Sequence, residues 1–225
     1  MCEPPSTTRT ARDPGLRAKL LARATQHRGI RAAYRAGVVL WDAVAELDRD
    51  NQTFLSQHLV SGWLGADLVG RDGAHACWLL VHQAATPAQR KVWFPWMQRA
   101  VLHGCADERD LAFLDDRVAR EAGRAQLHGT VTYGDTARLW PLAEPDTLPE
   151  LRAMLHLPPL SDQDIAAAWT FAELASAAPG VVGQNPAHKP PAAWQRARSP
   201  GGEVSGAEPP DGGQPTEGRG PHAGE

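Results

Sequence analysis

The stretch LWDAVAELDRDNQTFLSQH, residues 40–58, decides the fold class. Its large apolar side chains recur three, four or seven positions apart, at Leu40, Val44, Leu47, Phe54 and Leu55. This spacing is typical of an amphipathic helix that buries one face against a core, and we expect the helix to run from about Gly37 to His58. Asn51 falls inside the apolar stripe, so the pattern places a polar amide among buried neighbours.

Similar periods predict helices on both sides of this one. A basic amphipathic segment covers residues 16–27, and residues 73–84 form a second apolar helix that Asp72 can cap. Thr86-Pro87-Ala88-Gln89 reads as a capping box at the start of a third helix. Pro95 is expected to kink this third helix because proline lacks the backbone N–H.

Asp107 can cap a further helix, which the sequence closes at Gly123. The period then changes: residues 126–133 alternate between polar and apolar side chains, Gly134-Asp135 can form a turn, and residues 137–142 return. Residues 147–156 and 161–178 read as short closing helices. The predicted fold is therefore mainly α, a compact helical domain with one appended β-hairpin near residues 125–142.

Both ends of the chain differ in composition from the middle. Residues 179–225 contain 9 Pro and 10 Gly but no Leu, Ile or Phe, so they cannot bury enough apolar surface to offset the backbone entropy lost on folding. Residues 1–14 read the same way. We expect disordered tails over 1–14 and 179–225 around one domain at 15–178. Within the C-terminal tail, Trp194 is either a chance aromatic or part of a short ligand for a partner.

The composition excludes several functional classes. With 23 basic and 26 acidic residues the net charge is −3, which argues against a broad nucleic-acid surface. No apolar run approaches the ~18 residues of a membrane span, and the N-terminus lacks the apolar region of a signal peptide. Three cysteines without CxxC spacing indicate neither a disulfide framework nor a zinc site. The excess of arginine over lysine reflects GC-rich codons. We therefore expect a bacterial, cytoplasmic protein with no cofactor and no nucleic-acid or membrane partner.

Polar residues that fall on apolar faces are candidates for a site, because burying one without a partner costs about 1–3 kcal/mol. His75 and His82 share a stripe of the helix over residues 73–84. Seven residues separate them, which is about 10.5 Å along the axis, so they cannot chelate one ion. We predict no metal site.

Further polar candidates come from the next helix and from the hairpin. Asp115 projects onto an apolar stripe, while Asp116 and Arg117 lie beside it; in the hairpin Gln126 and His128 share a face with Thr130. These groups either converge on a pocket suited to proton transfer, where histidine titrates near neutrality, or form a polar network that only attaches the hairpin to the helices.

Several short motifs, taken in order, resemble one family. They are Asp48-x-x-Asn51, Gly62-Trp63, Val69-Gly70, Gly73-Ala74, Trp78-Leu79-Leu80, Phe113-Leu114-x-Asp116-Arg117, Gln126-x-x-Gly129-Thr130 and Leu157-Pro-Pro-Leu160. Over residues 47–160 the chain is similar to bacterial proteins grouped as domain of unknown function 6624. The resemblance implies a shared fold and no particular activity.

The chain also departs from the family pattern. The family's Gln-His-Ala-Asp is His82-Gln83-Ala84-Ala85 here, which moves the imidazole by about 100° around the helix and removes a carboxylate. The family's Gln-x-Tyr-Gly-Thr-Gln loses its tyrosine and its final glutamine, and His128 stands at the tyrosine position. The family pattern favours Asp116 with Arg117, whereas the helical projection favours Asp115. Lost activity and a changed substrate are both compatible with these departures.

Two functions follow, and the sequence does not choose between them. The first is a small-molecule enzyme or binder with a polar pocket, in which His82 or His128 is the general base. Its catalytic candidates are His82, His128, Asp116 and Arg117. Its ligand-binding candidates are Asn51, Gln83, Gln126 and Thr130. The second is a non-catalytic interaction protein, a degenerate family member that binds a partner through its tail or a Trp-rich surface.

Overall fold

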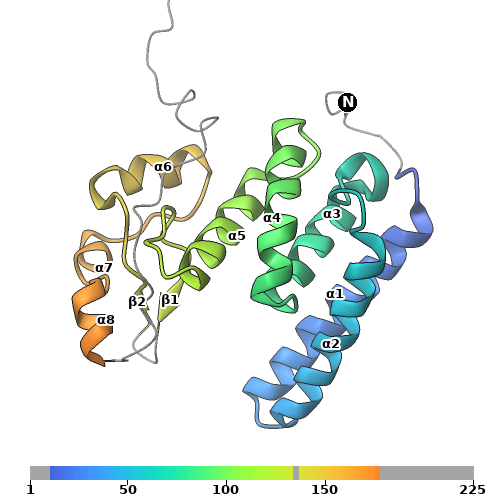
Figure 1. Cartoon of the computed structure of the whole chain (residues 1–225), viewed down its shortest axis with the longest axis horizontal. Coiled ribbons are helices and arrows are strands. Elements are labelled where there is room, and N and C mark those ends of the chain that lie inside the picture. The colour runs from blue at the N-terminus through green and yellow to red at the C-terminus, as the bar shows by residue number, and fades with distance from the viewer. Residues whose placement is uncertain (1–10, 134–136, 178–225) are drawn as a thin grey trace, which may run out of the picture. The chain divides into compact units, whose positions relative to one another are not determined.

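The computed structural model describes residues 11–133 and 137–177, and most of them are helical (Figure 1). All of them belong to one unit, which spans residues 1–189. The expected turn at Gly134-Asp135 and the expected tail over residues 179–225 lie outside the described residues. The prediction of a mainly helical fold with a small hairpin is confirmed.

Three N-terminal helices pack together: α1 (Pro14–Arg35), α2 (Trp41–His58) and α3 (Ala66–Gln83), with α1 in contact with both others. Helix α1 is longer at both ends than the expected segment. At its start the side chain of Asp13 accepts a hydrogen bond of 2.8 Å from the backbone N–H of Leu16. Asp13 also donates its own N–H to the carbonyl of Leu68. Residues 11–14, which composition assigned to the tail, therefore include the cap of the first helix.

The predicted start of α3 is wrong. The helix begins at Ala66, before the predicted start at Gly73, and its backbone leaves helical geometry at Gly70, where φ is 75° and ψ is 164°. The helical backbone resumes after this break, and there Oδ1 of Asp72 accepts a hydrogen bond of 2.9 Å from the backbone N–H of Gly73. Asp72 also pairs with Arg17 of α1, whose Nε donates a hydrogen bond of 2.8 Å to Oδ1. This hydrogen bond lowers the pKa of Asp72. Glycine permits the break at residue 70 because it has no Cβ to clash.

The next two helices are α4 (Pro87–Leu102) and α5 (Glu108–Glu121). Both predicted caps are confirmed: Thr86 and Gln89 form the capping box of α4, and Asp107 accepts from the N–H of Arg109 at the start of α5. Pro95 lies within α4, which continues to Leu102. Helix α5 contacts α4 on one side and α3 on another, which places it between the N-terminal helices and the hairpin (Figure 1).

The hairpin is shorter than the alternating pattern predicted. Strand β1 (Thr132–Tyr133) pairs antiparallel with β2 (Arg138–Leu139), and Gln126 makes only an isolated bridge to Leu142. Gly129 has φ 64°, which interrupts the extended backbone. Residues 126–131 therefore form a loop, in which both polar and apolar side chains are buried: Gln126, Leu127, His128 and Val131.

The chain closes with a 3-10 turn (Pro145–Thr147), α6 (Leu148–Met154), α7 (Asp162–Ala166) and α8 (Phe171–Ala177). The fully buried Trp140 packs with Leu174 of α8 and with Val131 at the start of the hairpin. Helices in the described ranges are all too short or too polar to cross a membrane.

Candidate functional site

Asp116 of α5 organises the loop over residues 126–131. The carboxylate is fully buried, and its Oδ1 accepts the backbone N–H groups of Leu127 at 2.8 Å and His128 at 3.0 Å. Its Oδ2 accepts the N–H of Thr130 at 2.9 Å and the hydroxyl of Thr130 at 2.8 Å. Burial raises the pKa of Asp116, and the neighbouring His128 and backbone donors oppose the rise. Four donors aimed at two oxygens match an ionised carboxylate that holds a loop.

Arg152 of α6 holds the same loop through its carbonyl groups. Nη1 donates to the carbonyls of His128 at 2.6 Å and Gly129 at 3.1 Å, while Nε and Nη2 donate to the carbonyl of Pro158. Sequence reasoning missed Arg152, because its partners lie in a segment more than twenty residues earlier. The contact attaches α6 to the Asp116 loop.

Gln126 makes hydrogen bonds that are also internal to the fold. Its Nε2 donates to the carbonyls of Val131 and Trp140, and its Oε1 accepts the N–H of Val131 at 2.8 Å. The imidazole of His128 is buried and lies 3.3 Å from Asp115, between Nε2 and Oδ2. The structure therefore brings Asp116, Gln126, His128 and Thr130 together, but in a region enclosed by protein. Asp115 and Asp116 are both buried, since the loop covers the side of α5 that carries Asp116.

His82 lies in a different environment at the end of α3. Its Nδ1 is 3.0 Å from Nε2 of Gln83, and its ring is near Trp78 and Phe113. Burial, together with the nearby Arg117 and Arg90, lowers the pKa of His82 to about 4. The imidazole is therefore neutral at neutral pH and a weak base.

Arg117 takes part in an ion-pair group next to this end of α3. Its Nε donates to Glu121 at 2.8 Å, and the buried Arg90 binds the same carboxylate through Nε and Nη2. Although burial opposes it, hydrogen bonds from both arginines hold the pKa of Glu121 below its usual range. Arg90 also donates to the carbonyl of Ala85. This group therefore ties α3, α4 and α5 together.

Asn51 is fully buried between α2 and α1. Its Oδ1 accepts a hydrogen bond of 3.0 Å from Arg23, while its Nδ2 has no partner among the described residues. One turn away, Asp48 pairs with Arg31 at 2.6 Å and lies 3.3 Å from the buried His27. The Asp48-x-x-Asn51 motif thus forms the polar part of the interface between the first two helices.

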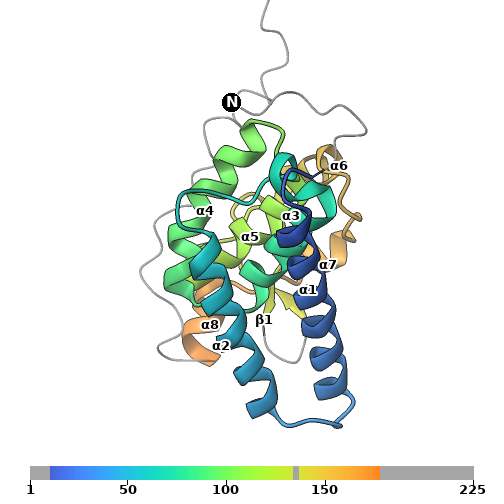
Figure 2. The same cartoon turned by 90° about the vertical axis from the view of Figure 1, so that its right-hand side faces the viewer.

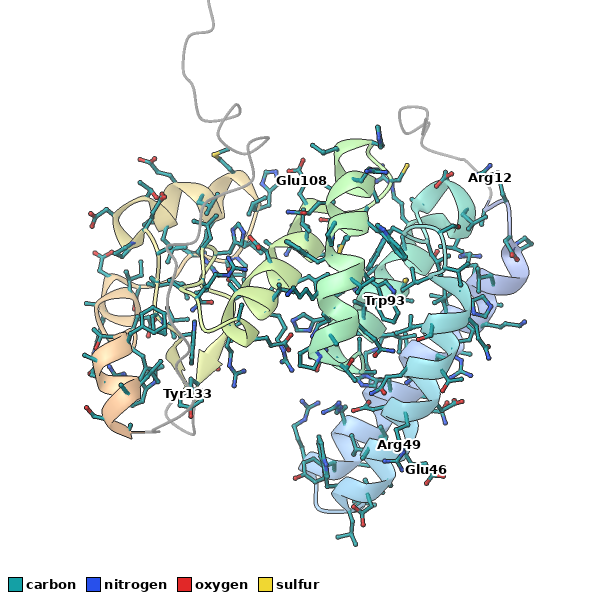
Figure 3. All side chains as sticks on the ribbon, viewed as in Figure 1. Arg12, Glu46, Arg49, Trp93, Glu108 and Tyr133 are labelled. Carbon is teal, nitrogen blue, oxygen red and sulfur yellow. The ribbon has the colours of Figure 1, made fainter. Side chains whose placement is uncertain are left out.

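A cavity of about 460 Å³ lies elsewhere, and its lining includes none of the eight predicted site residues. Its walls come from α3, the end of α4, the start of α5 and the end of α6. Figure 3 shows Glu108, one of the lining residues, at the N-terminal end of α5. The apolar part of the lining includes Met97, Met154 and Leu155, and the charged part includes Arg71 and Arg109.

A histidine–aspartate pair forms one wall of this cavity. Nδ1 of His75 lies 2.8 Å from Oδ2 of Asp110. The imidazole is 52% exposed, whereas the carboxylate is only 11% exposed. Trp78 stacks on the His75 ring at 4.9 Å between centroids. Burial raises the pKa of Asp110 to about 6, and the hydrogen bond with His75 opposes the rise. The pair thus joins an accessible imidazole to a shielded carboxylate.

The sequence contained one of the two signals for this pair. The helical stripe singled out His75, but Asp110 lies 35 residues later, in the first turn of a different helix. Over residues 11–133 and 137–177, no three His, Cys, Asp or Glu side chains are grouped so as to hold a metal ion.

A comparison with known families gives a match over most of the chain. The profile of a family of unknown function, DUF6624, matches residues 14–167 of the 225. The chain belongs to the DUF6624 family. No curated protein and no solved structure matches it. The DUF6624 match ends just after α7, so it covers the hairpin and the whole lining of the cavity.

The polar motifs that suggested DUF6624 are mainly buried. Asp116 and Thr130 are joined in the loop network, Gln126 bonds only to backbone groups, and Asn51 lies between two helices. These motif residues therefore make their hydrogen bonds to other parts of the fold. His75 and Asp110, in contrast, face a cavity and do not belong to these motifs.

Proposed function

We propose that this chain binds a small molecule in the cavity and that His75, oriented by Asp110, is the proton-transfer group. The observation that carries the proposal is the 2.8 Å contact between Nδ1 of His75 and the shielded carboxylate at the cavity wall. A carboxylate on one ring nitrogen fixes the tautomer, so Nδ1 carries the proton and Nε2 is the basic atom. Nε2 makes no hydrogen bond within the described part of the chain.

The chemistry of such a pair is general acid–base catalysis. Nε2 can accept a proton from a hydroxyl group or water in the cavity, and Asp110 then stabilises the imidazolium that forms. The raised pKa of Asp110, about 6, lies near the ordinary value for histidine.

The hydrogen bonds around the loop over residues 126–131 hold one wall of the cavity in place. Arg152 fixes the loop over residues 126–131 to α6, and the last residue of α6 with its C-cap, Met154 and Leu155, lines the cavity. Asp116 and Arg152 thus act as positioning residues for one wall. A role for His82 or His128 as the base stays a prediction, but His82 has a low pKa and His128 is enclosed.

A thermal-shift screen against metabolites tests the proposal. A molecule that binds the native state raises the melting temperature, and we expect hits on wild type that lose their shift in His75→Ala. His103→Ala is the matched control, since His103 is exposed and is not part of the lining. A hit that shifts His75→Ala as much as wild type would argue against a role for His75. Met154→Trp, which narrows the cavity, should also remove the shift.

The second function, a non-catalytic interaction protein, is supported by one surface. Trp41, the first residue of α2, is 50% exposed near the turn that joins α1 to α2. A role for residues 179–225 in partner binding stays a prediction, and those residues lie outside the described part of the chain. The bacterial source, the cytoplasmic location and the lack of a nucleic-acid partner also stay predictions from composition.

A further inference from the structure

An apolar surface lies at the loop that joins α1 to α2. Four large side chains there are exposed: Tyr34 41%, Val38 74%, Leu40 80% and Trp41 50%. Figure 2 shows this loop at the far end of the two antiparallel helices. We call these four residues the hairpin tip, meaning the turn between helices α1 and α2 and not the β-hairpin. Contiguous exposed apolar residues of this kind mark a binding surface more often than isolated ones do.

The hairpin tip is held in place by its own contacts. The rings of Tyr34 and Trp41 meet edge to face at 5.5 Å, and the guanidinium of Arg31 lies 5.4 Å from the Trp41 ring. Arg31 is itself fixed by Asp48 at 2.6 Å. The backbone N–H of Val38 bonds to the carbonyl of Ala33. Because the surface is already ordered, little conformational entropy is lost when a partner covers it.

Opposite charges flank the hairpin tip on its two helices. The exposed Arg28 and Arg35 belong to α1, and the exposed Asp42 and Glu46 belong to α2. Among the described residues these four make no ion pair. Figure 3 shows Glu46 on the side of α2 that faces away from α1. The hairpin therefore offers a cationic helix and an anionic helix, and neither charge set is neutralised by an ion pair within the described ranges.

We propose that a second copy of this chain covers the hairpin tip in a two-fold symmetric contact. A two-fold axis places α1 of one copy against α2 of the other, so both charge sets are paired twice while the apolar residues meet at the centre. A stable interface buries about 800 Å² on each partner, and a buried aromatic side chain supplies about 150–250 Å². Tyr34 is 41% and Trp41 50% exposed in a single copy, so the four tip residues supply only about half of this area, and the charged residues that flank them must supply the rest. The dimer is therefore weak and concentration dependent, and it is independent of the cavity.

Sedimentation velocity of the full chain, from micromolar to millimolar concentration at low salt, measures this association. Wild type is expected to dimerise reversibly, and Val38→Ser combined with Leu40→Ser should weaken the dimer by roughly tenfold or more. Val60→Ser is the matched control, because Val60 is 69% exposed outside the tip. Circular dichroism checks that each variant is folded. A wild-type chain that stays monomeric throughout, or a dimer unaffected by the tip variants, overturns the proposal.

Charge reversal tests the two-fold arrangement itself. Arg28→Glu with Arg35→Glu makes both helices acidic, and Asp42→Lys with Glu46→Lys makes both helices basic, so each double variant alone should be monomeric. An equimolar mixture of the two should dimerise, since every contact between copies is then between opposite charges. A mixture that remains monomeric, while wild type dimerises, overturns the two-fold contact. A protein that stays monomeric and binds anionic lipid vesicles through the hairpin tip would also overturn the proposed dimer.

Discussion

Asp116 binds backbone N–H groups of the loop over residues 126–131, and Arg152 binds backbone carbonyl groups of the same loop. The carboxylate of Asp116 accepts hydrogen bonds from the backbone N–H groups of Leu127, His128 and Thr130. The guanidinium of Arg152 donates to the carbonyls of His128 and Gly129. A buried loop must satisfy its peptide groups without water. Here one anion and one cation do so from two different helices, which makes the loop a rigid link between α5 and α6.

Asp116→Asn should destabilise the protein by about 2–4 kcal/mol, because the amide group would face N–H donors where a carboxylate oxygen now accepts. Urea denaturation measures the free energy of unfolding. Asp146→Asn, at an exposed position, is the control and should change that free energy little. An equal, small effect at both positions would contradict the role assigned to Asp116.

Arg152→Lys keeps the charge but loses the forked geometry that reaches three carbonyl groups. We expect a loss of about 2 kcal/mol in the free energy of unfolding. Arg99→Lys is the matched control on an exposed face of α4. If the lysine variant unfolds like wild type, the contact of Arg152 with the loop depends on charge alone.

Two glycines should respond in opposite ways to alanine. Gly129 has φ 64°, and a Cβ there would lie 3.0 Å from Leu160 and 3.2 Å from Leu148, so Gly129→Ala should destabilise the protein by about 1–2 kcal/mol. Gly29 lies within α1, and a Cβ added there would meet no atom within 4 Å, so Gly29→Ala should stabilise the helix by up to about 1 kcal/mol. Thermal denaturation ranks both variants against wild type, and the reverse order would refute the prediction.

His82 should make the protein sensitive to acid. Its pKa is lowered to about 4 in the folded state, below the value of about 6.5 for an unfolded chain, so the unfolded state binds more protons between these values. The stability that depends on neutral His82 is therefore complete above about pH 6.5 and is lost as the pH falls. Relative to His82→Gln, wild type should lose about 2 kcal/mol between about pH 7 and about pH 5. A constant difference over that range would show that His82 is not shielded.

Asp110 should have the opposite effect on how the stability of the protein changes with pH. Its folded-state pKa of about 6 lies above the ordinary value of 3.8, so the folded state binds more protons in this window. Its contribution to stability is present below pH 3.8 and is lost as the pH rises through about 6. The free energy of unfolding of wild type minus that of Asp110→Asn should therefore decrease from about pH 4 to about pH 6. Denaturation at several pH values, with Asp146→Asn as the control, measures the trend.

Local sequence signals predicted the helix ends well where the partners are close in the chain. Thr86 with Gln89 and Asp107 with Arg109 are separated by two or three residues, and both caps are confirmed. The predicted start after Asp72 differs from the structure because α3 already begins at Ala66, before the break at Gly70. No local signal predicted that Asp72 also pairs with Arg17, which lies 55 residues earlier. The alternating pattern over residues 126–133 failed at Gly129, where a positive φ turns the backbone away from a strand.

The order of residues along the chain determined the mainly helical fold, because apolar spacing and caps act within one or two turns. Which polar groups meet was decided only by the tertiary structure. Asp110 reaches His75 because α5 packs against α3, and Arg152 reaches the Asp116 loop because α6 returns to it. Such contacts depend on how helices pack over long separations in sequence, and no local period encodes them.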